Sequence, residues 1–184
     1  MLERMRRPYT RDQYLQLIEK MKGIIPGLSL STDIIAGFCG ETEEEHQQTL
    51  SLMREVEYDL AYMFAYSERE RTLAYRKFED DVPEEVKKRR LSEIISQQMS
   101  IQHRRNHDEI GHRHVVLVEG TSKRSEQQMS GRTDTNKIAV FDRNDFEKGD
   151  YVEVKTPGAP SATLIAKPIA TTSLRAYYSA VLEA

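Results

Sequence analysis

The stretch from Leu28 to Phe38 constrains the fold of this chain more than any other feature. It is a short apolar run without helical periodicity, which indicates a buried strand. Gly37 and Gly40 follow at its end, and glycine adopts backbone angles that other residues resist, so the chain can turn sharply there. In an α/β architecture, ligands bind at the carboxyl end of such a strand.

Asp33 lies inside this apolar run, and a buried carboxylate needs a hydrogen-bonding partner. The sequence therefore makes Asp33 the first candidate for a ligand contact. Thr42 and Glu45, just after the turn, have the spacing of a capping box, which predicts that a helix begins there.

Residues 1–81 alternate between predicted helices and strands. Thr10 to Lys22 reads as a capped amphipathic helix, and the strand at 28–38 is followed by a helix at 42–56 and a second strand at 60–66. This order predicts βα units around a parallel sheet. Because two strands cannot close a barrel, residues 1–81 are expected to be the last part of a larger α/β domain.

The remaining chain changes character twice. Residues 82–111, opened by Pro83, read as one long connecting helix. Residues 112–175 contain short β-prone runs separated by turn residues, and they predict a small all-β barrel of OB-like shape. The expected strands are 114–118, 127–133, 137–141, 150–155 and 163–169. Residues 176–184 are expected to form a loose tail.

Composition adds limits but no chemistry. The 184 residues carry a net charge of −3, and no apolar run approaches the ~18 residues of a membrane span, which favours a cytoplasmic protein. Cys39 is the only cysteine, so one chain can form neither an internal disulfide nor a cysteine-only metal site. Residues 112–175 hold ten Lys and Arg against eight Asp and Glu, so any RNA affinity must come from where the cations are placed.

Four sequence elements resemble, in order, those of the radical S-adenosylmethionine tRNA methylthiotransferase family, and the MiaB type most closely. Residues 31–42 resemble its S-T-D-I-I-x-G-F-P-G-E-T element, residues 5–10 its M-x-R-x-Y-T element and residues 66–72 its Y-S-x-R-P-G-T element. Residues 130–137 are similar to the TRAM RNA-binding domain of that family. The resemblance implies the C-terminal part of a radical S-adenosylmethionine TIM-like barrel, followed by a TRAM barrel.

The resemblance also implies a cofactor site. The family uses S-adenosylmethionine and two 4Fe–4S clusters, but its cluster-binding C-x3-C-x2-C motif does not occur in this sequence. By resemblance, Asp33 would bind the ribose, Ile35 the adenine and Ser67 the adenine edge. Arg7, or Arg6 if the register slips, would face the methionine carboxylate, since a guanidinium meets a carboxylate bidentately. The alternative for Asp33 is a structural role at the end of its strand. The alternative for Arg6 and Arg7 is a solvated basic pair.

RNA contacts are implied in two regions. Arg69 would face substrate, although Glu70 and Arg71 stand where the family has Pro and Gly, so this loop is expected to differ. In the TRAM region, contacts to the tRNA backbone are implied for Ser122, Lys123, Arg124, Arg132, Asn136 and Lys137. The alternative is that these residues lie in charged loops that contact only solvent.

Several other residues invite a functional reading but favour a structural one. Phe141, Phe146 and Tyr151 could stack on bases, yet core packing is the expected role. Cys39 is interpreted as a half-buried structural thiol. The sequence offers no third ligand motif beside its clustered histidines, so we expect a surface cluster rather than a metal site; they are His103, His107, His112 and His114.

The resemblance implies a part of an enzyme that adds a 2-methylthio group to N6-isopentenyladenosine in tRNA by radical chemistry. Without the cluster cysteines, this chain alone is expected to be inactive. Its expected partner is the tRNA anticodon stem-loop, with no membrane or DNA, and exposed half-barrel edges favour self-association. The alternatives are a standalone RNA-binding module, or part of a sister enzyme acting on ribosomal protein or threonylcarbamoyladenosine.

Overall fold

The computed structural model describes residues 1–160 and 162–182. The chain divides into two compact units, Met1–Ile101 and Gln102–Ala184, and each has a hydrophobic core of its own. The division falls inside one long helix. The domain limits expected from sequence, at residues 81, 111 and 175, stay predictions.

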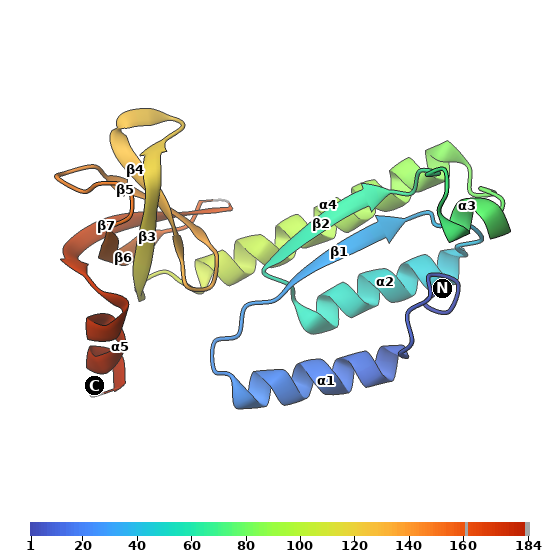
Figure 1. The fold of residues 1–184 in the computed structure, drawn as a ribbon, viewed down its shortest axis with the longest axis horizontal. Coiled ribbons are helices and arrows are strands. Elements are labelled where there is room, and N and C mark those ends of the chain that lie inside the picture. Colours follow the sequence, from blue (N-terminus) through green and yellow to red (C-terminus); the bar gives the residue numbers. More distant parts are fainter. Residues whose placement is uncertain (161, 183–184) are drawn as a thin grey trace. The chain divides into compact units, whose positions relative to one another are not determined.

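The first unit alternates helices and strands, as the sequence indicates (Figure 1). Its elements are α1 (Arg11–Ile24), β1 (Ser31–Ala36), α2 (Glu43–Val56), β2 (Leu60–Ala65), α3 (Leu73–Lys77) and the start of α4 (Glu84–His107). Both expected capping boxes are present: Thr10 pairs with Gln13 at α1, and Thr42 pairs with Glu45 at α2. The two strands pair in parallel from Ser31 opposite Leu60 onward, which confirms the α/β part of the fold.

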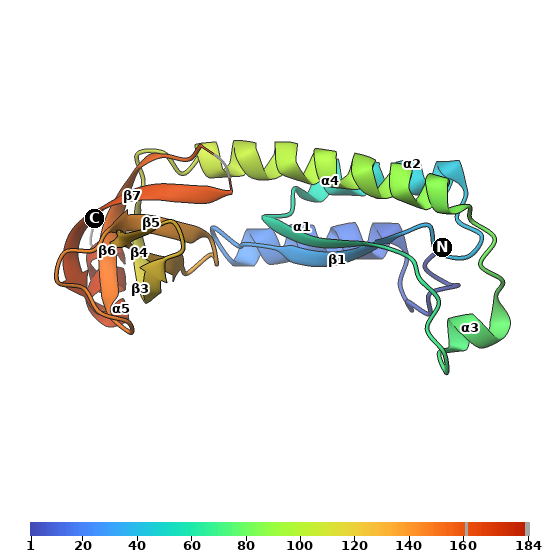
Figure 2. The ribbon, with the colours of Figure 1, turned by 90° about the horizontal axis from the view of Figure 1, so that it is seen from above.

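Within the described residues of the first unit, helices cover one face of this two-stranded sheet. Ile34, Ala36 and Met63 pack into a core with α1, α2 and α4, and Figure 2 shows α4 running along one side of the strands. The alternate residues point to the other face, as the pleat of a strand requires. That open face carries Asp33, Ile35, Tyr62 and Phe64, all of them exposed.

The burial expected for Asp33 is therefore wrong. Asp33 lies in an apolar stretch, but its side chain falls on the open face, opposite Tyr62 in the neighbouring strand. The apolar residues around it made the whole run look buried, whereas only every second residue meets the helices. Asp33 consequently has no burial cost that a structural partner must offset.

The second unit contains a closed barrel in the order β3-β4-β5-β7-β6. Neighbouring strands are antiparallel, except that β5 runs parallel to β7. The strands are β3 (Arg113–Ser122), β4 (Ser125–Thr133), β5 (Ile138–Asp142), β6 (Tyr151–Gly158) and β7 (Thr163–Thr172). Five strands in this closed arrangement confirm the OB-like fold class.

The barrel interior explains the aromatic residues that the sequence left open. Phe141 is 1% exposed and packs edge-to-face on Phe146, with ring centroids 5.9 Å apart. The core around them is otherwise aliphatic and includes Val116, Val152 and Leu164. Phe141 and Phe146 are core residues, as expected, while Tyr151 is half-buried at the start of β6.

The expected loose tail is mostly a helix. α5 (Leu174–Leu182) follows β7 directly, and its first turn is supported by Ser173, whose Oγ accepts from the N–H of Ala176 at 3.2 Å. Residues 183–184 lie outside the described part of the chain. Among the helices that the structure describes, none combines the length and apolarity needed to cross a membrane.

Candidate functional site

The turn after β1 is held in a conformation that glycine alone adopts freely. Gly37 has φ +74°, in the left-handed region, and a Cβ built there would lie 2.4 Å from Cγ of Lys87 in α4. A side chain at this position would therefore strain the backbone and collide with α4. The glycine lets the carboxyl end of β1 approach that helix closely.

A buried ion pair anchors the same turn. Glu41 accepts from the N–H of Gly37 at 2.7 Å and from Nη1 of Arg90 at 2.8 Å, both through Oε2. Nη1 of Arg90 also donates to the carbonyl of Glu41 at 2.9 Å. Both side chains are almost fully buried, at 3% and 6% exposure. Sequence reasoning missed this pair because its partners are 49 residues apart and Arg90 belongs to no motif.

Lys87, beside Gly37, is also buried and paired. Its Nζ donates to Oδ2 of Asp80 at 2.5 Å and to Oε1 of Glu84 at 3.1 Å, and it lies 5.5 Å from the ring centre of Tyr66. Burial alone would lower the pKa of Lys87, but the hydrogen bonds to the two carboxylates outweigh it and raise that pKa. The ammonium is therefore a permanent charge under the turn.

The N-terminal segment closes over the turn from the other side. Arg4 donates through Nη1 to the carbonyl of Gly40 at 2.7 Å and through Nη2 to Oε2 of Glu45 at 2.6 Å. Cys39, between these contacts, is 3% exposed, so it is fully buried rather than half-buried as expected. The residues around the turn thus form one rigid polar clamp at the carboxyl edge of β1.

The residues implied in cofactor binding are accessible. Asp33 and Ile35 lie on the open face of β1, with Ile35 39% exposed, opposite Phe64 of β2. Ser67 is exposed just beyond the carboxyl end of β2, and Arg7 is exposed before α1. The structure brings Asp33 and Ile35 to one face of the sheet and leaves all four side chains open to a ligand.

The loop after β2 keeps a glycine-like backbone where the sequence departs from the family pattern. Arg71 has φ +68°, the left-handed conformation that the family's glycine would adopt at low cost. Arg69 is exposed in this loop, and its carbonyl accepts from the hydroxyl of Thr72 at 2.7 Å. Arg71 therefore holds a backbone conformation that costs local strain in a residue with a side chain.

One cluster in this unit has the composition of a metal site. Oxygen and nitrogen atoms of Glu43, His46 and Glu93 lie within 4.8 Å of one another. However, Arg89 already bridges the carboxylates, at 2.6 Å from Glu43 and 2.6 Å from Glu93. The hydrogen bond from Arg89 lowers the pKa of Glu43 to about 2. A guanidinium in this place repels a cation, so the cluster is an ion-pair network.

The predicted histidine cluster takes no part in that group. His103, His107 and His112 are exposed, and His114 is half-buried in the second unit with Nε2 3.5 Å from Glu109. Burial lowers the pKa of His114 below its ordinary value. Within the described residues, these histidines do not meet the further ligands that a metal site requires.

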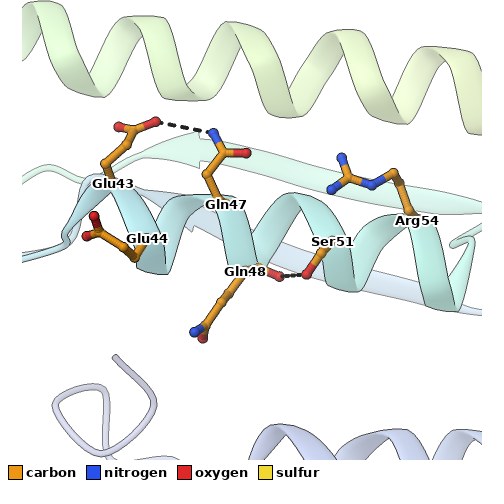
Figure 3. Close-up of a pocket in the computed structure, with 6 residues that line it drawn as sticks. All are labelled: Glu43, Glu44, Gln47, Gln48, Ser51 and Arg54. Carbon is orange, nitrogen blue, oxygen red and sulfur yellow. Dashed lines mark hydrogen bonds between the residues drawn. The ribbon is translucent and has the colours of Figure 1, made fainter.

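A shallow hollow runs along α2, but it carries no chemistry (Figure 3). The side chains that line it all come from this one helix: Glu43, Glu44, Gln47, Gln48, Ser51 and Arg54. Figure 3 shows Gln47 hydrogen-bonded to Glu43, and the hydroxyl of Ser51 bonded to the backbone carbonyl of Gln48. None of the residues expected to bind ligand is among them.

In the barrel, the first group of implied RNA contacts lies at the turn between β3 and β4. Lys123 and Arg124 are exposed at its tip, and Ser122 is half-buried at the end of β3. Oγ of Ser122 accepts from the N–H of Arg124 at 3.4 Å. Two cations are thus presented together on a short turn.

The second group lies at the turn between β4 and β5. Nη1 of Arg132 donates to Oδ1 of Asn136 at 3.0 Å, and Nε of Arg132 is 3.2 Å from Glu119. Asn136 has φ +62°, so it takes the left-handed position of the turn, which asparagine tolerates. Arg132 and Asn136 both remain accessible.

Lys137 does not belong with them. Its side chain is 7% exposed, and Nζ donates to Oδ1 of Asn106 at 3.0 Å and lies 3.5 Å from Glu109. The ammonium therefore supports the packing of the barrel against the end of α4 within this unit. The RNA contact implied for Lys137 stays a prediction, and in this structure the ammonium is already buried and paired.

Comparison with known proteins gives one domain match and several long matches. Residues 109–168 match the TRAM domain family. The chain is 53% identical to the tRNA-2-methylthio-N(6)-dimethylallyladenosine synthase of Chlorobium phaeobacteroides, over 91% of this chain and 38% of that protein. It is 46% identical to the human mitochondrial tRNA methylthiotransferase CDK5RAP1, over 95% of this chain and 31% of that protein. The chain thus spans about a third of the length of these relatives.

Proposed function

We propose that the barrel of this chain binds tRNA as part of a tRNA methylthiotransferase. The chain is similar over about nine tenths of its length to the C-terminal part of such enzymes. The TRAM match over the closed barrel is the observation that carries this proposal. The target proposed is the anticodon stem-loop containing isopentenyladenosine. The relatives are transferases by name.

The barrel offers the side chains that phosphate recognition uses. Lys123 and Arg124 stand at one turn, and Arg132 and Asn136 at another, all of them accessible. Contacts of this kind position a nucleic acid without reading its sequence. Ser122 completes the first turn, whereas Lys137 acts from within the unit as a structural cation.

We propose that the first unit contributes one part of an S-adenosylmethionine site. The fit rests on the open sheet face, where the Asp33 carboxylate can accept from both ribose hydroxyls and Ile35 offers an apolar contact for adenine. Ser67 at the end of β2 and Arg7 before α1 would bind the adenine edge and the methionine carboxylate. The cofactor would supply the radical chemistry; these residues only hold and orient it.

The 4Fe–4S clusters are not supported by this chain's own residues. Its one cysteine, Cys39, is buried in the clamp around the β1 turn, and a 4Fe–4S cluster is held by several cysteine thiolates. We therefore propose that residues 1–184 alone do not catalyse methylthiolation. Arg69, exposed in the loop after β2, is proposed to face the substrate. A cytoplasmic location stays a prediction.

The test is salt-dependent binding of the chain to unmodified and isopentenylated anticodon stem-loops. We expect micromolar binding that weakens as salt increases. The variant Lys123→Ala/Arg124→Ala should bind more weakly, with a salt slope lower by roughly 1.5. The control Lys155→Ala/Lys167→Ala removes two exposed cations that face each other across β6 and β7, and it should bind like the unsubstituted chain.

Two results would contradict the proposal. Absence of binding at low salt would remove the RNA-binding function. An equal loss of affinity in the two double variants would show that only bulk charge attracts the RNA, and that the β3–β4 turn is not a contact site.

A further inference from the structure

Helix α5, which the sequence left as a tail, is attached to the barrel by two neighbouring tyrosine hydroxyls. The hydroxyl of Tyr177 donates to the carbonyl of Arg113 at 2.9 Å, at the start of β3. The hydroxyl of Tyr178 donates to Oδ2 of Asp134 at 2.5 Å, in the turn between β4 and β5. The helix, red in Figure 1, therefore reaches two different parts of the barrel.

Asp134 occupies a central place in that turn. Its Oδ1 accepts from the N–H of Thr135 at 2.9 Å, so both carboxylate oxygens are engaged. The turn is closed by the N–H of Asn136, which donates to the carbonyl of Thr133 at 2.9 Å. Two residues before Asp134 and two residues after it stand Arg132 and Asn136, which are bonded to each other.

The negative charge of Asp134 would weaken an RNA contact at this turn unless the carboxylate is held in place by another group. Arg132 already lies 3.2 Å from the carboxylate of Glu119. A second free carboxylate in the same turn would add to the competition with phosphate for the guanidinium, because carboxylates and phosphates pair with arginine in the same way. The hydroxyl of Tyr178 holds the carboxylate on the side of α5 instead. The hydrogen bond to Asp134 raises the pKa of Tyr178 to about 12, so the hydroxyl stays protonated as a donor at neutral pH.

We propose that Tyr178 is a positioning residue for RNA binding, which acts through Asp134 to hold the β4–β5 turn so that Arg132 and Asn136 face phosphate. The inference rests on the proposed RNA-binding function and extends it to the C-terminal helix. Tyr178 itself need not touch the RNA. Its contribution is the conformation and charge placement of the turn.

The first test compares two tyrosines on the same helix. Tyr178→Phe removes only the hydroxyl on Asp134 and should weaken stem-loop binding by roughly three- to tenfold. Tyr177→Phe removes an equivalent hydroxyl, whose partner is the carbonyl of Arg113, and should bind like the unsubstituted chain. If both variants lose the same affinity, the effect comes from docking of the helix as a whole and the proposal is wrong.

The second test uses the sign of the effect at Asp134. Asp134→Ala removes a negative charge, so simple electrostatics predicts tighter binding; positioning predicts weaker binding, because the turn loses its link to α5. Asp134→Asn removes the same charge but keeps a side chain that can hydrogen-bond to Tyr178, so it should bind at least as well as the unsubstituted chain. A merely electrostatic role would make both variants bind more tightly.

The two levels of the proposal fail differently. If the unsubstituted chain does not bind the stem-loop, the proposed function falls, and this inference falls with it. If the unsubstituted chain binds and Tyr178→Phe and Asp134→Ala bind equally well, RNA binding stands and the positioning role of Tyr178 is overturned. Thermal unfolding of each variant checks that the barrel remains folded.

Discussion

The two units of this chain differ in how their sheets end. In the second unit five strands close on themselves, so every strand has two neighbours and one core fills the interior. In the first unit two strands pair only with each other, and helices cover one of their faces. Closure satisfies the backbone groups of a sheet without outside help, whereas an open sheet leaves edges and a face to be covered.

The difference also separates two kinds of functional surface. In the barrel, the proposed contacts stand on turns, and the strands behind them are fixed by a complete core. In the first unit, the proposed cofactor residues Asp33 and Ile35 stand on the strands themselves, on the face that lacks a covering layer. We propose that the barrel binds RNA through turns that its own core supports, and that the open sheet supplies one part of a cofactor site.

The largest expected effect comes from the barrel core. Phe141→Ala should destabilise the second unit by about 3–5 kcal/mol, since it empties a fully buried aromatic site. Phe64→Ala, on the open face where Phe64 is 54% exposed, should change the stability of the first unit by less than about 0.5 kcal/mol. Amide hydrogen exchange measures each unit separately. Equal losses would show that the open face is covered in solution.

The next effect concerns the clamp on the β1 turn. Glu41→Gln leaves the buried guanidinium of Arg90 without its main charge partner and should destabilise the first unit by about 3 kcal/mol. We expect the lower end of the usual range because Nη2 of Arg90 retains Glu43 at 3.3 Å. Chemical unfolding, monitored by amide hydrogen exchange in α2, measures this loss of stability.

Glu44→Gln is the matched control, since it removes an exposed carboxylate three residues further along, in the first turn of α2. Its effect should stay within about 0.5 kcal/mol. If Glu41→Gln and Glu44→Gln lose equal stability, the Glu41–Arg90 pair contributes no more to stability than an exposed carboxylate does. The clamp then does not depend on this pair.

A third prediction concerns the uncovered face directly. Apolar side chains exposed together favour association, so this chain should self-associate through the face that carries Tyr62 and Phe64. Tyr62→Ser/Phe64→Ser should weaken that association by about tenfold or more in sedimentation experiments. Ile165→Ser/Ile169→Ser, on exposed positions of β7, is the control and should leave it unchanged. If the Ile165→Ser/Ile169→Ser variant weakens self-association and the Tyr62→Ser/Phe64→Ser variant does not, the surface through which the copies associate lies on the barrel.

Much of this architecture could be predicted from local patterns. The capping boxes at Thr10 and Thr42 set the helix starts correctly, because a cap depends on residues three positions apart. Each predicted barrel strand overlaps an observed one, since alternation and turn residues are also local signals. The loose tail predicted from residue 176 is wrong as far as Leu182, where α5 ends, because this helix has few polar markers and its tyrosine contacts reach residues far away in sequence.

The site could be predicted only where residue type and position agreed. The sequence placed Asp33 in the right strand but on the wrong side, since a uniformly apolar run hides which alternate residues meet helices. From the sequence, Lys137 was expected to contact RNA like Arg132. Its side chain is instead buried and paired with Glu109 and Asn106, which lie 28 and 31 residues away in sequence. Glu41 lies in a motif, but nothing near it in sequence indicated its buried partner Arg90. Contacts between distant residues decided each of these cases.

The smallest expected effect is the acid response of the ion pairs on α2. The pKa of Glu43 is lowered from 4.5 to about 2 by the hydrogen bond from Arg89. A carboxyl whose pKa is lower in the folded state stabilises that state above its unfolded pKa, and the benefit is lost as pH falls from about 4.5 towards 2. Because this pair is exposed, the gain in stability is small, but the titration midpoint is directly measurable.

Carboxyl-carbon NMR of Glu43 should show a midpoint near pH 2 in the unsubstituted chain. Arg89→Gln should move that midpoint back towards 4.5, since the guanidinium is its main cause. Arg124→Gln, which removes an exposed cation from the barrel, is the control and should leave the midpoint in place. A midpoint near 4.5 in all three proteins would mean that Arg89 does not hold Glu43 in solution.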